Sequence, residues 1–422
     1  MPDDLVVREV LPSGLRLVTE RMPHVRSITV GVWLARGSRH EEAGESGIAH
    51  FIEHMLFKGT STRSAEDIAQ QIDSIGGQLD AFTAKEYASY YIKVLDEHLP
   101  IAIDLLSDMV TRPAFSDSDV EKEQGVILEE IKMVEDTPDD LVHEIFTQHA
   151  WGGHPLGRPI LGTPETVSSF AAPMLSAYFT GAYVAPNVII AAAGNVEHDR
   201  LRAMIEQAFG PLPRAGSAGV DTPPVMVPGA VQRHKDLEQS HICIGAPGHE
   251  QRHEDRYVSY ILNTILGGSM SSRLFQNVRE RRGLAYSVYS GISSYRDTGL
   301  FSVYAGCAAS KVSEVIDVVL DELRLIRREP VSGDELTRAK DHLKGSLMLS
   351  LENTASRMSH LARQEIYFGR HFTLDETLAG IERVTRDDIL RVAGMLFDDT
   401  ALVGTVLGPK NGFTLTEEQL SL

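Results

Sequence analysis

The feature that most constrains the fold is a break rich in Pro, Gly and Ser near the middle of the 422-residue chain. The stretch GPLPRAGSAGVDTPPVMVPGAVQ, residues 210–232, cannot form one continuous helix or a central strand. On either side of it the same pattern occurs, in which an alternating, strand-like stretch leads through a charged loop containing histidine into a helical run. The pattern predicts two copies of one unit, residues 1–215 and 233–422, joined by a linker at 210–232.

The two halves continue in the same way after these helical runs. Each has a predicted hairpin of β-branched and aromatic residues, after Gly76 in the first half and after Arg282 in the second. Long amphipathic segments follow and predict helices. They cover residues 99–110, 116–134 and 138–149 in the first half, and 312–328 and 332–367 in the second. The expected fold class is α+β, with two related α/β-roll halves, each an antiparallel-rich sheet with packed helices.

Charge and composition argue against several classes of function. The chain has 40 Lys and Arg against 59 Asp and Glu, a formal net charge of -19, so a general affinity for nucleic acid or anionic membranes is not expected. The two cysteines, Cys243 and Cys307, lie in apolar stretches and are predicted to be small core residues without a disulfide. The N-terminus lacks the pattern of a signal peptide, and no run of 18 apolar residues occurs. We expect a soluble, cytoplasmic protein.

The strongest chemical signal is GIAHFIEHMLFKGT, residues 47–60, where His50, Glu53 and His54 interrupt an apolar helical run. Residues three and four apart share one face of a helix, so the two imidazoles and the carboxylate project together. Two histidines at this spacing suit Zn²⁺, and Glu53 is placed to accept the proton of a zinc-bound water that attacks a carbonyl. His-x-x-Glu-His is the inverted form of a zinc-protease motif. The alternative is a chance pair of histidines on an ordinary helix.

A third ligand is expected from the carboxylate-rich segment 118–136. Glu123 and Glu130 are seven residues apart and share a helix face that also carries apolar residues. Those apolar residues are Val126, Ile127, Met133 and Val134. We predict Glu130 as the ligand and Glu123 as a catalytic-site carboxylate that orients a histidine or the ligand itself. Glu129 is rotated by about 100° toward the lysines of the segment and is predicted to be solvated. The alternative is a helix with no metal role.

These residues carry a specific resemblance. The stretch GSRHEEAGESGIAHFIEHMLFKGT, followed by EKEQGVILEE with Glu130 placed 76 residues after His54, resembles the pitrilysin and insulinase superfamily of zinc peptidases. Within it, the mitochondrial processing peptidase and its bacterial homologues are most similar. The likeness covers nearly the whole chain and includes the two-half architecture. It implies one zinc per chain, held by His50, His54 and Glu130, with Glu53 as the general base.

The resemblance also implies residues that hold the substrate. The stretch GGQLDAFTAKEYASYY is similar to the edge strand to which family members add the substrate backbone, and it supplies Asp80, Ala81 and Phe82 as contacts. The family usually has Asn at the position of Asp80. In the second half, VRERRGLAYSV is similar to the segment whose Arg and Tyr grip the substrate and stabilise the oxyanion, which indicates Arg279 and Tyr286.

Several alternatives stay open at this point. Arg281 and Arg282 compete with Arg279, and the arginine cluster could also be a solvated basic turn. The implied function is a zinc metallo-endopeptidase that cleaves peptides or unfolded segments in a closed chamber, with the negative net charge favouring basic substrates. Longer family members contain four such units and this chain two, so a homodimer is implied. The alternatives are a noncatalytic structural or chaperone-like subunit, or a peptidase that works only with a degenerate partner chain.

Overall fold

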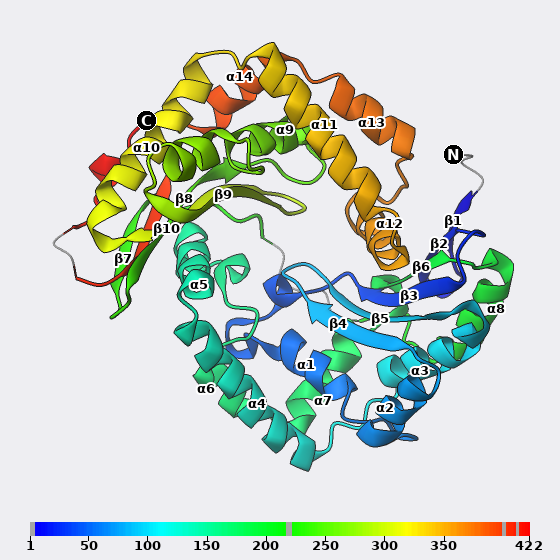
Figure 1. Cartoon of the computed structure of the whole chain (residues 1–422). Coiled ribbons are helices and arrows are strands. Elements are labelled where there is room, and N and C mark those ends of the chain that lie inside the picture. The colour runs from blue at the N-terminus through cyan, green and yellow to red at the C-terminus, as the bar shows by residue number, and fades with distance from the viewer. Residues whose placement is uncertain (1–4, 217–221, 399–401, 411–412) are drawn as a thin grey trace. The chain divides into compact units, whose positions relative to one another are not determined.

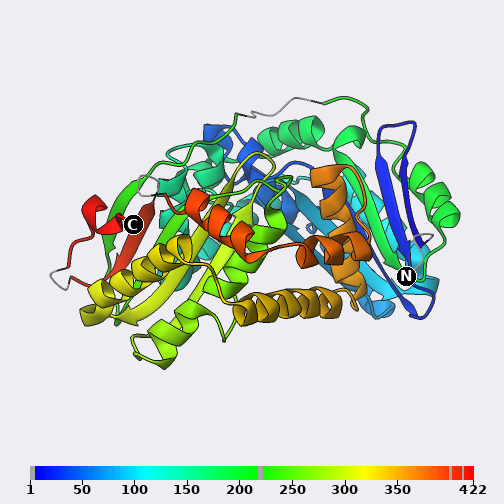
Figure 2. The same ribbon diagram turned by 90° about the horizontal axis from the view of Figure 1, so that it is seen from above.

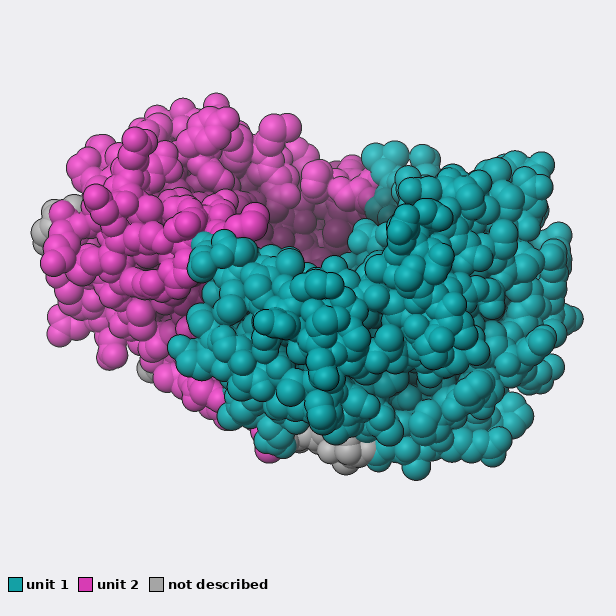
Figure 3. Space-filling model, turned by 90° about the horizontal axis from the view of Figure 1, so that it is seen from below, with its two compact units in different colours: residues 1–132, 158–221, 349–372 teal, residues 133–157, 222–348, 373–422 magenta. Residues whose placement is uncertain are grey.

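Two β-sheets with the same strand order organise the chain. The computed structural model describes residues 5–216, 222–398, 402–410 and 413–422. These form two units (Figure 3). Unit 1 comprises Met1–Lys132, Arg158–Asp221 and Leu349–Phe372, and unit 2 comprises Met133–Gly157, Thr222–Met348 and Thr373–Leu422. Each unit contains one whole sheet.

The sheet of unit 1 has the order β1-β2-β6-β3-β5-β4, and that of unit 2 has the order β7-β11-β8-β10-β9 (Figure 1). The strands of the first are β1 Val6–Val10, β2 Arg16–Arg21, β3 Ser27–Leu34, β4 Gln78–Thr83, β5 Ala88–Leu95 and β6 Val188–Gly194. Those of the second are β7 Gly229–His234, β8 Gln239–Gly248, β9 Ala285–Ser294, β10 Gly299–Ala308 and β11 Val403–Gly408.

The two sheets match strand for strand once β1 is set aside. Each has one parallel pair, β2 with β6 and β7 with β11. Each then continues through three antiparallel pairs, which end on β4 in unit 1 and on β9 in unit 2. This agreement confirms the predicted α+β class with a duplicated unit.

One face of the sheet in unit 1 is covered by helices from the first half of the chain. They are α1 Ile48–Leu56, α2 Ala65–Ser74, α3 Leu99–Thr111, α7 Ala172–Ala182 and α8 His198–Ala208, with α6 Pro164–Ser169 and the start of α4 Asp117–Asp136 nearby. Alternate residues of β3, such as Ile28 and Val30, point into this core, whereas Trp33 points to the other face. This period of two is what a strand between two packed layers requires.

The other face of this sheet is covered by α12 Thr354–Phe368, which lies against β2, β3 and β6 (Figure 1). Strand β6, VIIAAAG, is buried at every position because it is covered on both faces. Gly31 on β3 allows the close approach of α12, since a Cβ at this position would lie 2.9 Å from Sδ of Met358. Trp33 donates a hydrogen bond from Nε1 to the same sulfur at 3.0 Å.

The sheet of unit 2 is covered in the equivalent way. On one face α9 Arg256–Leu266, α10 Val312–Arg328 and α14 Arg386–Leu396 pack together (Figures 1 and 2). The remaining helices of this unit include α11 Gly333–Ser350 and α13 Leu374–Glu382. On the other face α5 Pro138–Ala150 packs against β8 and β11. Gly245 on β8 is again the point of close approach, because a Cβ there would lie 2.4 Å from Cζ of Phe146.

The units are therefore not divided at the predicted boundaries of 1–215 and 233–422. Helix α5 comes from the first half of the chain but packs in unit 2, and α12 comes from the second half but packs in unit 1. The reason is that the apolar face of each helix is needed to cover a sheet face that the other helices of that unit leave open. The expectation that the first half is the zinc-binding catalytic domain, and the second a related noncatalytic domain that contributes substrate contacts, stays a prediction.

The linker also differs from the prediction. Within 210–232, residues 217–221 lie outside the described residues, and β7 already begins at Gly229. The segment 332–367, predicted as one helical stretch, is two helices, α11 and α12. The chain breaks between them because Asn353 caps α12, with its Oδ1 accepting a hydrogen bond from the backbone N–H of Ala355 at 2.8 Å.

Smaller features agree with the sequence. The helices predicted at 99–110, 116–134, 138–149 and 312–328 correspond to α3, α4, α5 and α10 within two residues at each end. Cys243 and Cys307 are buried and free. Among the helices of the described residues, none combines the length and the apolar character that crossing a bilayer requires.

Candidate metal and catalytic site

Helix α1 presents the motif, and its first turn is held by a buried carboxylate. The helix begins after Gly47, which has a positive φ of 95° and offers no side chain to cap it. Glu41 takes this role, since its Oε2 accepts from the N–H of Gly47 at 2.8 Å and its Oε1 accepts from the N–H of Ala49 at 2.9 Å. A Cβ at Gly47 would lie 2.7 Å from Cα of Gly162. The start of α1 is therefore fixed by hydrogen bonds and by close packing.

Three possible ligands converge between α1 and α4. Nε2 of His50 lies 3.7 Å from one carboxylate oxygen of Glu130, and Nε2 of His54 lies 3.6 Å from the other. The ligand atoms of all three residues lie within 4.8 Å of one another. Ligands at tetrahedral angles around a zinc ion 2.0–2.1 Å away would be about 3.4 Å apart. The donor set therefore fits a divalent cation of the size and ligand preference of Zn²⁺.

The protonation of His50 suits this role. Burial, and then the neighbouring His54 ring, lower the pKa of His50 to about 4, so the imidazole is neutral near pH 7 and its nitrogen lone pair is available. The two rings lie 4.7 Å apart between centroids. Nδ1 of His50 is buried and has no hydrogen-bond partner among the described residues.

Glu123 contacts the second histidine. Its Oε2 lies 2.9 Å from Nδ1 of His54, which leaves Nε2 of that ring turned toward Glu130. Only 3% of Glu123 is exposed, and its other oxygen forms an ion pair with Nζ of Lys58 at 2.7 Å. A carboxylate on the far nitrogen of a ligating histidine fixes the ring and its tautomer. The contact is the one that the predicted orienting role requires, and the role itself stays a prediction.

Glu53 lies on the same helix face but contacts a different element. Its Oε2 accepts a hydrogen bond from Oγ1 of Thr83, the last residue of β4, at 2.5 Å. Burial raises the pKa of the Glu53 carboxyl above its usual range, and the Thr83 hydrogen bond acts in the opposite direction. A half-buried carboxylate with a raised pKa beside a possible metal site has the properties of a general base.

The predicted face of α4 is correct for the carboxylates and wrong for two apolar residues. Glu123 and Ile127 are buried and Glu130 is half-buried, as expected. Val126 is 43% exposed and Met133 67% exposed, because the inward face is narrower than the predicted stripe. Glu129, by contrast, is exposed and pairs with Lys132 at 2.6 Å, as predicted.

The predicted substrate strand is the edge strand β4. It pairs with β5 and, among the described residues, with no other strand. Asp80 is exposed and accepts a hydrogen bond from the Tyr91 hydroxyl at 3.0 Å. Ala81 points with Thr83 toward the face that carries α1, while Phe82 packs on the opposite face with its ring 5.5 Å from that of Trp33. The free edge of β4 can accept an added strand.

A largely apolar groove of about 530 Å³ lies beside the start of β4. It is lined by Phe57, Ala65, Ile68, Ala69, Ile72, Asp73, Gly77, Gln78 and Leu79. Phe57 follows the end of α1, and Leu79 points to the face of β4 that also carries Thr83. Side chains of a strand added to β4 would enter such a groove at every second residue.

Arg279 and Tyr286 belong to unit 2, on the π-helical turn Phe275–Glu280 and on β9. The guanidinium of Arg279 lies 4.8 Å from the ring centre of Phe275 and 4.7 Å from that of Tyr286. Tyr286 is 78% exposed. The pair therefore forms a preformed cation–π contact, and its part in substrate binding stays a prediction. Arg281 instead donates to Oδ1 of Asn277 at 2.8 Å.

A second group of possible ligands, in unit 2, has unfavourable geometry. His249, His253 and Asp255 lie in the segment between β8 and α9. The two rings are stacked 3.8 Å apart and nearly parallel at 5°, so their lone pairs do not converge on one point. Arg391 donates to both carboxylate oxygens of Asp255, at 2.8 and 2.6 Å. This positive charge disfavours a cation there.

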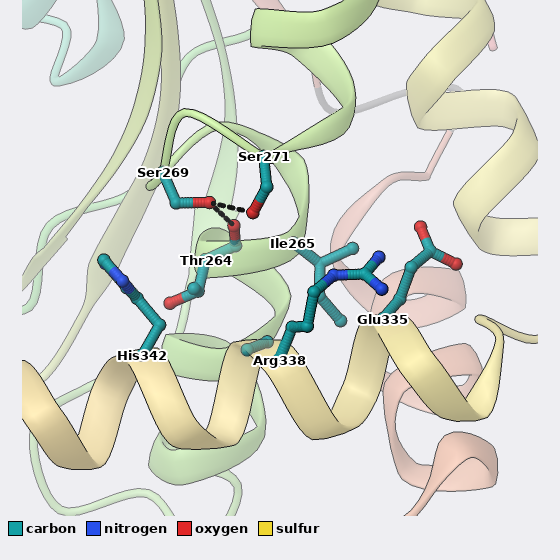
Figure 4. Close-up of a pocket in the computed structure, with 8 residues that line it drawn as sticks. Thr264, Ile265, Ser269, Ser271, Glu335, Arg338 and His342 are labelled. Carbon is teal, nitrogen blue, oxygen red and sulfur yellow. Dashed lines mark hydrogen bonds between the residues drawn. The ribbon is translucent and has the colours of Figure 1, made fainter.

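A small pocket in unit 2 lies between α9, the loop that follows it, and α11 (Figure 4). Its volume of about 20 Å³ is enough for a single water. Its lining includes Ser269 and Ser271, and also Glu335, whose carboxylate is engaged by Arg273 at 2.9 Å. The pocket lacks the ligand set found on α1.

Three residues of the site were not predicted from the sequence: Glu41, Lys58 and Thr83. Lys58 is four residues after His54, and helical spacing could have indicated it. Thr83 lies two residues after Ala81, so the period of two in β4 places it on the face of the core. Glu41 had no comparable signal, because its partners are backbone N–H groups six and eight residues further along the chain.

Comparisons with known proteins identify the family of the chain. The family model described as insulinase (peptidase family M16) matches residues 16–164, and that described as peptidase M16 inactive domain matches residues 169–343. A protein of Bacillus subtilis named an uncharacterized zinc protease is 44% identical over 399 residues, which cover 94% of this chain and 97% of its own. One of Mycobacterium tuberculosis with the same description is 42% identical, with coverage of 98% and 95%.

Solved structures show the same fold. A protease from Helicobacter pylori has a TM-score of 0.90 at 22% identity, covering 96% of this chain and 99% of that one. A protein of Pseudomonas fluorescens described as a peptidase M16 inactive domain has a TM-score of 0.89 at 21% identity, covering 97% and 99%. The resemblance predicted from the motifs is thereby confirmed at the level of the superfamily, and the chain belongs to the insulinase family of peptidases, family M16.

Proposed function

We propose that this protein is a zinc-dependent endopeptidase whose ligands are His50, His54 and Glu130 and whose general base is Glu53. The observation that carries the proposal is the convergence of two imidazole Nε2 atoms on the two oxygens of Glu130, at 3.7 and 3.6 Å. The zinc protease names of the relatives support the choice of metal. The match of residues 169–343 to an inactive domain supports a single zinc per chain, in the first half.

The chemistry follows from the residues around this point. When bound, zinc supplies the positive charge that polarises the scissile carbonyl and the attacking water. Glu53 takes the proton of that water and later passes it to the leaving amine. Glu123 and Lys58 hold His54 in one orientation, so the ligand set is preorganised and the reaction does not require it to rearrange.

The substrate class follows from β4 and the groove beside it. An extended peptide can pair with the free edge of β4, with its scissile bond at the level of Thr83 and Glu53. An apolar side chain further along the peptide would fill the groove lined by Phe57 and Leu79. The net charge of -19 favours basic peptides. Because strand addition requires an extended backbone, we expect peptides or unfolded segments rather than folded proteins to be cleaved.

We further propose that Arg279 and Tyr286 contact the substrate. We also propose that the active form is a homodimer, similar to the processing peptidases in using paired chains. Two related units with one converged set of ligands among the described residues support this assembly, because longer family members combine four such units.

The deciding experiment measures metal content and hydrolysis on the same sample. Purified protein is analysed for zinc by mass spectrometry and assayed with a quenched basic peptide, before and after dialysis against a chelator. We expect about one zinc per chain, chelator-sensitive cleavage, and recovery when zinc is returned. A metal-free protein that cleaves the peptide, or a zinc-loaded protein that cleaves no peptide of a varied library, would contradict the proposal.

A further inference from the structure

Thr83 connects the strand expected to hold the substrate with the proposed base. It is the last residue of β4, and its hydroxyl donates a hydrogen bond of 2.5 Å to Oε2 of Glu53 on α1. The β4 backbone is fixed at this point by pairing with Ala88 of β5. Threonine is stiff about χ1 because it is branched at Cβ, so a fixed backbone also fixes the hydroxyl.

Among the described residues, Thr83 is the hydrogen-bond partner that orients the Glu53 carboxylate. The hydrogen bonds of the described residues include one to Glu53, and its donor is Thr83. A hydroxyl that donates a hydrogen bond to Oε2 occupies one lone pair of that oxygen, so Oε1 keeps more capacity to accept a proton from the attacking water. The bond therefore favours one orientation of the carboxylate, in which Oε1 is the oxygen that accepts the proton.

We propose that Thr83 is a positioning residue for catalysis, which orients the Glu53 carboxylate toward the water and couples that orientation to the β4 backbone on which the peptide lies. This inference rests on the proposed peptidase function and names a further residue of the same site. The hydrogen bond of the Thr83 hydroxyl goes to Glu53 and not to any of the three proposed ligands, His50, His54 and Glu130. Removing its hydroxyl should therefore slow the chemical step without loosening the metal or the peptide.

The test compares Thr83→Val, which keeps the shape and removes the hydroxyl, with Thr83→Ser, which keeps the hydroxyl. We expect Thr83→Val to lower kcat by about 10- to 100-fold, the cost of a displaced catalytic group. KM should stay within about twofold of the wild type, and so should the zinc affinity measured by competition with a chromogenic chelator. Thr83→Ser should restore kcat to within about threefold.

The matched control is Thr29→Val. Thr29 is a buried threonine of the same sheet, whereas Thr83 is half-buried, and the Thr29 hydroxyl shares a hydrogen bond of 2.8 Å with that of Thr354 on α12. Its loss removes a buried hydrogen bond without touching α1, so kcat should be unchanged even if the protein is less stable. Equal losses of kcat in both variants would show a general effect of packing and overturn the inference.

A double-mutant cycle that combines Thr83→Val with Glu53→Gln distinguishes a positioning role of Thr83 from direct contact with the substrate. With the base removed, Thr83→Val should have no further effect on the affinity for an uncleaved peptide, measured by fluorescence anisotropy, or on the zinc affinity. Weaker peptide binding in the double variant would make Thr83 a substrate contact instead. If the wild type hydrolyses peptides and Thr83→Val is equally fast, the inference alone fails. A wild type without peptidase activity would overturn the proposed function and this inference with it.

Discussion

At the scale of single residues, three carboxylates of the proposed site have different surroundings. Glu53, Glu123 and Glu130 differ in their partners: a threonine hydroxyl, a histidine with a lysine, and two histidines, respectively. The identity of the residue does not determine its role. The partner does, because it decides whether the carboxylate is free to accept a proton, holds a ring, or binds a cation.

Glu53→Gln should keep zinc and lose turnover. Glutamine has the shape of glutamate but cannot take a proton near neutral pH, so we expect kcat to fall by about 10² to 10⁴. Zinc content by mass spectrometry and the midpoint of urea unfolding should match those of the wild type. A zinc-free Glu53→Gln protein would instead make Glu53 a ligand.

Glu130→Gln and Glu129→Gln form a paired test of the ligand on α4. The first removes a carboxylate that faces both histidines, whereas the second removes one that is exposed and pairs with Lys132. We expect zinc affinity to fall by at least about tenfold in Glu130→Gln and to be unchanged in Glu129→Gln. Chelator competition at fixed pH measures both. The same affinity in the two variants would refute the assignment.

At the scale of elements, α5 and α12 depend on a glycine in the strand that they cross. Gly245→Ala would place a Cβ 2.4 Å from Cζ of Phe146, so the ring or the helix must move. We expect a loss of about 1–3 kcal/mol in the free energy of unfolding, the usual cost of overpacking. Gly291→Ala in the same sheet is the control, because the nearest atom to its new Cβ is Oγ of Ser302 at 3.8 Å. Urea unfolding of both variants measures the two losses. A Gly245→Ala variant as stable as the wild type would contradict the close packing of Phe146 on Gly245.

The ion pair that links α9 to α14 predicts a dependence on pH. Hydrogen bonds from Arg391 hold the pKa of Asp255 below its usual range. A carboxyl whose pKa is lowered by folding contributes stability above its unfolded pKa, about 3.9, and this stability is lost as the pH falls through the folded pKa.

Asp255→Asn should therefore be less stable than the wild type from about pH 5 to 8, and the difference should shrink in more acidic solution. The effect should be modest, since half of the Arg391 side chain is exposed. Chemical unfolding at a series of pH values measures it, and a difference that persists in acid would contradict the assignment.

Elements and motif were predictable from the sequence because their signals are local. His50, Glu53 and His54 are defined by spacing on one helix, and β4 and β5 by alternation over a few residues. The membership of α5 and α12 in the units was not predictable, since an amphipathic pattern shows that a helix has an apolar face but not which sheet will receive it. Thr83 and Glu41 were missed for the same reason: each acts through a contact with a residue that the local pattern does not specify.

At the scale of the whole molecule, the proposed homodimer leads to a prediction about size. One chain carries two related units and, among its described residues, one converged set of ligands with a base beside it. We expect a species of twice 46.4 kDa in light scattering, and cleavage of unstructured peptides of roughly tens of residues with neglect of stable folded proteins. A monodisperse monomer with full activity at the same concentration would refute the dimer and leave the zinc assignment unaffected.

Because α12 is encoded in the second half of the chain but packs in unit 1, unit 1 cannot complete its packing until late in translation. Strands β1 to β6 are complete once residue 194 has been made, but the helix that covers their second face is not made until residue 368. Until then Trp33, Ile189 and Ala191 lack the α12 side chains that bury them in the folded protein. A nascent chain arrested before α12 should therefore bind chaperones, and release of the arrest past residue 372 should end that binding.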